Sequence, residues 1–214
     1  MILAVAICPH PPMLVPEISG GAAGELDEVR EACDEVVAGL LTVGPDRIVV
    51  IGGGDLDGDR DEAAGGTLGG FGVNVRAGGA DDALPLSLTI GAWLLDRAGW
   101  SGPRTYSSGT PDTDGRVALL VMADGSATRA ITAPGYLDDR AEPFDAIIAE
   151  ALAGGDPSTL AALDVDLGDE LWAAGSRPLR TLGEMTKDAD ITARLRVDVA
   201  PFGVGYWVAD WRLG

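Results

Sequence analysis

One histidine, held between prolines, is the residue best placed to do chemistry in this chain. It lies in the segment Pro9-His10-Pro11-Pro12, directly after a short apolar run, and the prolines fix the backbone on both sides of it. A stiff loop that presents an imidazole suits a metal ligand or a general base. The alternative is a histidine that is hydrogen-bonded within a turn. Since the sequence contains a single histidine, it excludes every mechanism that needs two histidines from one chain.

Further polar groups follow two other apolar runs. Asp55 comes after the run that ends at Ile51, and Asp124 and Ser126 come after the run that ends at Ala123. Ligands of open α/β sheets bind beyond the carboxyl ends of the strands, so we expect these groups and His10 to converge on one edge. His10, Asp124 and Ser126 are the candidate catalytic residues. His10, Asp55 and Asp124 are the candidate metal ligands, a set suited to weak binding of Mg²⁺ or Mn²⁺.

Other motifs favour simpler explanations. The acidic run of residues 55–62 lacks the glycine and glutamate positions of an EF-hand, which favours a solvated acidic loop over a calcium site. The glycines of residues 52–54 do not form a GxGxxG motif, and Ser126 lacks the GxSxG motif of a serine hydrolase. Nothing in these segments indicates nucleotide binding or serine-hydrolase chemistry.

The elements that would position the candidate residues alternate between strands and helices. Apolar runs predict buried strands over residues 2–8, 46–51 and 116–123, and a further strand is expected over 104–107. Helical spacing of apolar residues predicts helices over 22–42, 86–98 and 141–153, with short helices up to 174 and over 178–184. A closing antiparallel hairpin is expected over 194–199 and 204–211. The first strand, helix and second strand form a β-α-β unit with parallel strands. We predict one α/β domain over residues 1–214, with a mostly parallel central sheet flanked by helices.

Residues 52–80 fit this scheme least well. The segment is rich in glycine and acidic residues and has little periodicity, so we expect a long loop with one short strand at Phe71–Val75. Loops of this length in compact domains are usually functional or mobile. The segment is therefore either a lid over the site or a peripheral excursion.

Composition narrows the class of partner. The net charge of −19 repels nucleic-acid phosphates and anionic membrane surfaces, and no apolar run is long enough to span a membrane. The two cysteines, Cys8 and Cys33, are too few for a disulfide scaffold or a four-thiolate metal site. We expect both to be buried thiols in a reducing cytoplasm. A small molecule, a protein partner or a second copy of the chain are the partners that remain.

Several segments together resemble one known family. They are CPHPPMLVPEI, LLVMADGSATR, APGYLDDRAEPFDAIIAEALAGGD and PFGVGYWVADW. These segments, with the helix and strand up to Ile51, are similar to class III extradiol ring-cleavage dioxygenases, specifically the subunit-B-like proteins of high-GC bacteria. The resemblance implies an α/β fold whose active members hold Fe(II) with two His and one Glu. It also implies a further His that acts as acid and base while dioxygen enters a catechol-type ring. A triad of this kind leaves iron positions open for substrate and dioxygen.

The match to that family is incomplete at the site. His10 matches the first iron ligand, but the second ligand is expected after the second strand, where this chain has Gly52-Gly-Gly-Asp55. Ala127 takes the place of the acid/base His, and Arg177 and Pro178 follow Gly175 where the Glu ligand is expected. Loss of two direct ligands should abolish an iron site.

The expectation is therefore the family's fold without its reaction. We expect a non-catalytic or diverged member that binds a small molecule or a protein partner and needs no cofactor. The alternative is an active metal-dependent enzyme, dioxygenase-like or hydrolytic. It would use His10 with Asp55 and Asp124 to hold Fe(II), Mg²⁺ or Mn²⁺.

Overall fold

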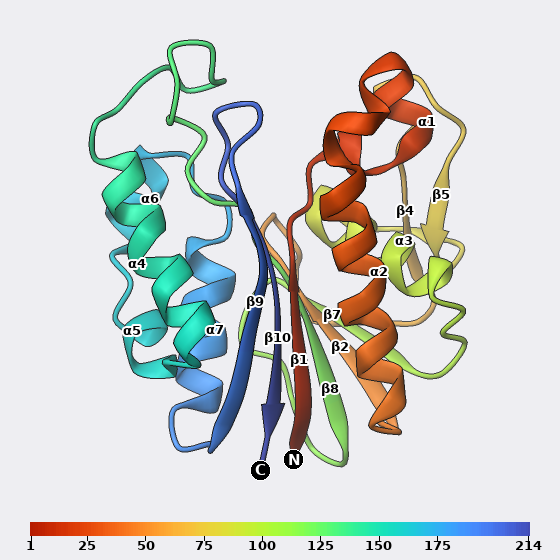
Figure 1. Cartoon of the computed structure of the whole chain (residues 1–214). Helices are drawn as coiled ribbons and strands as arrows, with labels where there is room; N and C mark the ends of the chain where they lie inside the picture. The colour runs from red at the N-terminus through yellow and green to blue at the C-terminus, as the bar shows by residue number, and fades with distance from the viewer.

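A seven-stranded sheet forms the centre of the computed structural model, which describes residues 1–20 and 24–214 (Figure 1). Its strand order is β3-β7-β2-β8-β1-β10-β9. The strands are β1 (Ile2–Cys8), β2 (Arg47–Ile51), β3 (Arg60–Asp61), β7 (Arg104–Ser107), β8 (Val117–Met122), β9 (Ile191–Val199) and β10 (Tyr206–Leu213). β7, β2, β8 and β1 are parallel, whereas β3, β10 and β9 pair antiparallel to their neighbours. The predicted fold class is confirmed: a mostly parallel sheet with an antiparallel hairpin at the C-terminus.

The first β-α-β unit differs from the simplest expectation in one respect. β1 and β2 are parallel, as predicted, but β8 lies between them and pairs with both. A strand far away in sequence therefore occupies the centre of the sheet, and all of its residues are buried.

Helices cover both faces of the sheet. One face carries α2 (Asp27–Thr42) and α3 (Leu86–Arg97), and the other carries α4 (Ala141–Gly154), α5 (Pro157–Ala161), α6 (Val165–Glu170) and α7 (Ser176–Thr186). The short helix α1 (Pro16–Ser19) follows the loop after β1. The expected start of the first long helix at residue 22 lies outside the described residues, and α2 begins at Asp27.

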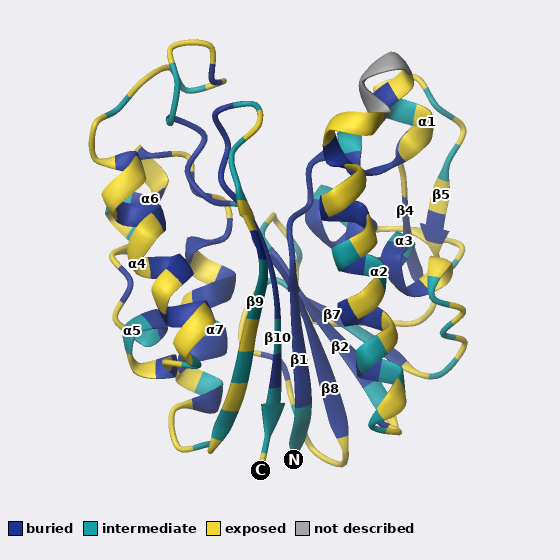
Figure 2. Cartoon of the chain, viewed as in Figure 1, coloured by how far each residue is buried: buried dark blue, intermediate teal, exposed yellow. Residues whose placement is uncertain are grey.

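Two apolar cores result from the alternation of side chains along each strand. In β1, Ala4 and Ala6 face the core beneath α2 and α3, whereas Val5 and Ile7 face the core beneath α4–α7. Figure 2 shows the central strands buried along most of their length. Cys8 and Cys33 are both buried and free, as expected. Among the described residues, no helix is both long enough and apolar enough to cross a membrane.

The glycine-rich segment after β2 contains a second sheet, of order β5-β4-β6, packed against α3. Its strands are β4 (Ala64–Thr67), β5 (Arg76–Gly78) and β6 (Asp81–Asp82). The predicted strand at Phe71–Val75 is wrong, because Gly69–Phe71 forms a 3-10 turn. A Cβ on Gly65 or Gly66 would lie 2.0 Å from Gly79 O or Thr89 Oγ1. Close backbone approach specifies this sheet, and it leaves no alternation of apolar residues in the sequence.

Candidate functional site

The carboxyl ends of β1 and β8 lie side by side, because the two strands are parallel neighbours in the sheet. The Ala123 N–H donates to the Cys8 carbonyl at 2.8 Å and extends this pairing past β8. Asp124 then forms an antiparallel bridge with Tyr206, the first residue of β10. Three adjacent strands thus bring His10, Asp124 and Tyr206 to one edge of the sheet.

His10 and Asp124 are in direct contact. The His10 backbone N–H donates to Asp124 Oδ1 at 2.7 Å, and His10 Nδ1 lies 3.5 Å from the same oxygen. The His10 side chain is only 9% exposed. Its Nδ1 atom is buried and finds no hydrogen-bond partner in the described part of the chain. The fold therefore holds this imidazole in place but gives its Nδ1 no hydrogen-bond partner, which is unusual for a buried polar group.

The Asp124 carboxylate is largely buried, with 14% of its side chain exposed. Burial raises its pKa, while the nearby His10 and its backbone N–H pull the pKa in the opposite direction. The pKa of Tyr206 is also raised, first by burial of the phenol and then by the neighbouring Asp124 carboxylate. This edge of the sheet is therefore a poorly hydrated environment that disfavours negative charge.

Ser126 is fully buried and is engaged by a carboxylate that sequence analysis missed. Its N–H donates to Asp145 Oδ1 at 2.9 Å and its hydroxyl donates to Asp145 Oδ2 at 2.8 Å. Arg129 Nη1 lies 3.7 Å from Asp145 Oδ2. The Ser126 hydroxyl therefore fixes the turn after β8 and is not presented as a nucleophile. The sequence signal that could have revealed Asp145 is an acidic residue on the apolar face of α4, between Phe144 and Ile148.

Positions where the resemblance implies further iron ligands are occupied by backbone or by unsuitable side chains. A Cβ on Gly53 would lie 3.3 Å from the Ala174 carbonyl, and one on Gly175 would lie 2.6 Å from the Asp124 carbonyl. Ala127 offers a methyl group, and its N–H donates to the Leu171 carbonyl. Arg177 is 61% exposed and forms an ion pair with Asp169.

These residues do not fit the Fe(II) centre that the resemblance implies. Among the described residues, no group of three His, Cys, Asp or Glu side chains could hold a metal ion. Asp55 is exposed after β2, and the structure does not join it to His10 and Asp124 in such a group. Two donors, His10 and Asp124, are what this site offers.

An aromatic rim is formed by Tyr136 in the loop after β8 and by Trp172 after α6, since a Cβ on Gly135 would lie 3.3 Å from the Trp172 ring. Tyr136 and Trp172 are exposed, and both have a positive φ, of 65° and 57°. A pocket of about 210 Å³ lies next to Trp172 and is also lined by Ala173 and Ala174. The Ala174 carbonyl lies close to the loop after β2, and the next N–H, of Gly175, donates to the Asp124 carbonyl at 2.8 Å. The backbone of residues 174–175 therefore contacts the loop after β2 and the residue that follows β8.

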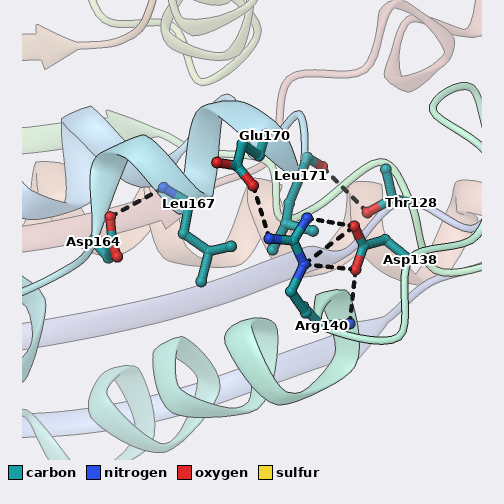
Figure 3. Close-up of polar contacts among 7 residues, drawn as sticks. All are labelled: Thr128, Asp138, Arg140, Asp164, Leu167, Glu170 and Leu171. Carbon is teal, nitrogen blue, oxygen red and sulfur yellow. Dashed lines mark hydrogen bonds and ion pairs between the residues drawn. The ribbon is translucent and has the colours of Figure 1, made fainter.

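Polar contacts hold this rim in place (Figure 3). Arg140 bonds Asp138 in its own loop and also reaches Glu170 at the end of α6, with an Nη1–Oε2 distance of 2.7 Å. Hydrogen bonds from Arg140 lower the pKa of Asp138 to about 2. Thr128 Oγ1 donates to the Leu171 carbonyl at 3.4 Å. The loop after β8 is therefore fastened to the α6 region.

Comparison with known proteins supports the fold alone. No family model matches the chain, and no curated protein matches it. The crystal structure of uncharacterized protein JW3007 from Escherichia coli K12 is similar over 98% of this chain and 99% of its own. The TM-score is 0.55 and the sequence identity is 13%. The whole architecture thus recurs in a solved structure, with little identity in sequence.

Proposed function

We propose that this protein is a non-catalytic relative of the class III extradiol dioxygenases that binds a small molecule at the His10–Asp124 site. The observation that carries the proposal is the buried, unpartnered Nδ1 of His10, 3.5 Å from Asp124 Oδ1. Buried polar atoms without partners inside a protein usually have a functional reason.

The segments that carry the family resemblance are also the segments that build this edge. Gly125 N–H donates to the Gly205 carbonyl, Gly205 N–H to the Ser126 carbonyl, and Arg129 N–H to the Gly203 carbonyl. The turn after β8 and the loop before β10 are thus joined, and Asp124 joins both to the proline-rich loop. The resemblance is therefore strongest where the structure forms one compact site.

The groups that ring cleavage in this family requires are missing from the His10–Asp124 site. Ring cleavage needs a proton acceptor beside the substrate, and Ala127 cannot exchange a proton. A ferrous ion needs more direct ligands than His10 and Asp124 provide. The protein retains a site that can bind, without the groups that would turn over a catechol. A reducing cytoplasmic location belongs to the same proposal, and the two free, buried thiols support it.

The decisive experiment measures iron content and ring cleavage. Purified protein is incubated anaerobically with Fe(II), desalted, analysed for iron and then assayed with catechol in air. We expect iron well below one equivalent and no yellow ring-opened product, both for the wild type and for His10→Ala. Stoichiometric iron with ring cleavage, both lost in His10→Ala, would refute the proposal and favour the metal-dependent alternative.

A further inference from the structure

The Asp124 carboxylate lacks the cation that a carboxylate in such a position normally has. Its recorded contacts within the described chain are the His10 N–H at 2.7 Å and His10 Nδ1 at 3.5 Å, both to Oδ1. No donor to Oδ2 is recorded there, and neither an Arg nor a Lys lies within ion-pair distance. A largely buried carboxylate is costly unless a cation or several donors compensate it.

Cations that lie nearby in sequence are engaged by other acids. Arg129 lies 3.7 Å from both Asp145 Oδ2 and Glu142 Oε1. Arg177 is paired with Asp169 at the surface. The described part of the chain therefore leaves the compensating charge to come from outside.

His10 Nδ1 lies beside the same carboxylate and has no hydrogen-bond partner in the described part of the chain, and Asp124 adds the lone pairs of Oδ2. A protonated primary amine carries three N–H donors around one positive charge, so it can satisfy both groups at once. A divalent ion would need more ligands than these two residues supply, and the described residues hold no third acid, His or Cys to complete the set.

We infer that the His10–Asp124 site binds its small molecule through a protonated amine on that molecule. This inference rests on the proposed function and adds the charge and donor pattern of the ligand.

Matched probes test the inference. Benzylamine and benzyl alcohol have the same ring and differ in the head group, so calorimetric titration of each isolates the charge. We expect benzylamine to bind at least about tenfold more tightly than benzyl alcohol, because a charge-assisted hydrogen bond is roughly twice as strong as a neutral one. Asp124→Asn should remove this preference. Asp139→Asn, which removes the same charge from an exposed residue of the loop after β8, should keep it.

Three results with the two probes would overturn the inference. They are equal binding of the two probes, a preference that survives in Asp124→Asn, and no benzylamine binding at millimolar concentration. A control titration with MgCl₂ or MnCl₂ covers the remaining source of positive charge: Asp124-dependent binding of the metal that excludes benzylamine would also overturn it. Failure of the proposed function is distinguished by the iron and catechol assay, which does not depend on amine binding.

Discussion

Two acidic side chains near the turn after β8, Asp145 and Asp124, differ in the partners that the fold gives them. Asp145 is 2% exposed and accepts two hydrogen bonds from Ser126, with Arg129 close by. Asp124 is 14% exposed, accepts one backbone N–H, and has no Arg or Lys beside it among the described residues. The comparison separates a carboxylate whose charge the chain compensates from one that it leaves without a cationic Arg or Lys partner.

The pKa values of both carboxyls are raised, and burial is the largest cause at each. Burial raises the pKa of Asp145, and the Ser126 hydrogen bonds and Arg129 counteract this rise. Burial also raises the pKa of Asp124, where His10 supplies the opposing contributions. The difference between the two sites therefore lies in how many partners the chain supplies to the ionised form.

Removal of Asp145 should have the largest effect. Asp145→Ala leaves the Ser126 N–H and hydroxyl without acceptors inside the core and separates Arg129 from its partner. We expect the free energy of unfolding to fall by about 3 kcal/mol, as for other broken buried pairs. Urea denaturation followed by tryptophan fluorescence measures the change. A loss as small as that of exposed Asp139→Ala would show that Asp145 is not the structural member of the pair.

A second substitution tests how closely the chain approaches Asp124. A Cβ on Gly175 would lie 2.6 Å from the Asp124 carbonyl and 2.7 Å from Ala123 Cβ. We expect Gly175→Ala to cost about 2 kcal/mol through local displacement, and to weaken any ligand bound at Asp124. Thermal unfolding and the benzylamine titration measure the two effects.

Gly154→Ala is the matched control. Gly154 is the last residue of α4, and a Cβ there would meet nothing within 4 Å. Alanine is the better helix former by about 1 kcal/mol, so this variant should be as stable as the wild type or more stable. Equal losses in the two variants would contradict the close approach at Gly175.

The extent to which the sequence anticipates this site depends on the kind of signal. β1 begins and ends at the predicted residues, because a continuous apolar run bounded by proline leaves few other choices. β7 also has the predicted bounds, although its sequence, Arg-Thr-Tyr-Ser, is not an apolar run. His10 and Asp124 could be placed together by the rule that parallel strands end at one edge. The neighbour Tyr206 could not, because nothing local in the sequence shows that β10 returns beside β1.

Asp145 and the second sheet were missed for different physical reasons. Asp145 lies on an apolar helix face, and its partner is a serine in a distant turn, so the pairing exists only in the folded chain. In the second sheet, Gly65 allows close approach of the Gly79 backbone and Gly66 allows close approach of the Thr89 side chain, and neither glycine adds an apolar side chain. Contacts made through glycines leave little pattern for a periodicity analysis.

The comparison also predicts a substitution that raises the free energy of unfolding instead of lowering it. Asp124→Asn keeps an acceptor for the His10 N–H and removes an incompletely compensated charge. We expect the free energy of unfolding at neutral pH to rise by about 1 kcal/mol, a typical gain from a single stabilising substitution. The same variant should lose amine selectivity, so stability and binding change in opposite directions.

The pH dependence of this gain has a defined sign. Because the folded-state pKa of Asp124 lies above its ordinary value of 3.8, the folded chain binds more protons than the unfolded chain between those two values. The contribution of Asp124 to stability is therefore lost as the pH rises through that window. The stability difference between Asp124→Asn and the wild type should grow with pH across the window and then level off. A difference that does not vary with pH would contradict the raised pKa.

The smallest expected effect comes from the rim, and it tests whether Tyr136 contributes to the amine preference assigned to Asp124. Tyr136 has a φ of 65° and an exposed side chain, a backbone conformation that glycine adopts without strain. Tyr136→Gly should leave stability unchanged or raise it by about 0.5 kcal/mol, since relief of strain exceeds the entropy cost of glycine only slightly. If the rim contributes only to the uncharged part of the ligand, benzylamine and benzyl alcohol should weaken by the same factor and their ratio should stay constant. Thermal unfolding with paired titrations measures both. A change in the ratio would show that Tyr136, and not Asp124 alone, distinguishes charged from neutral head groups.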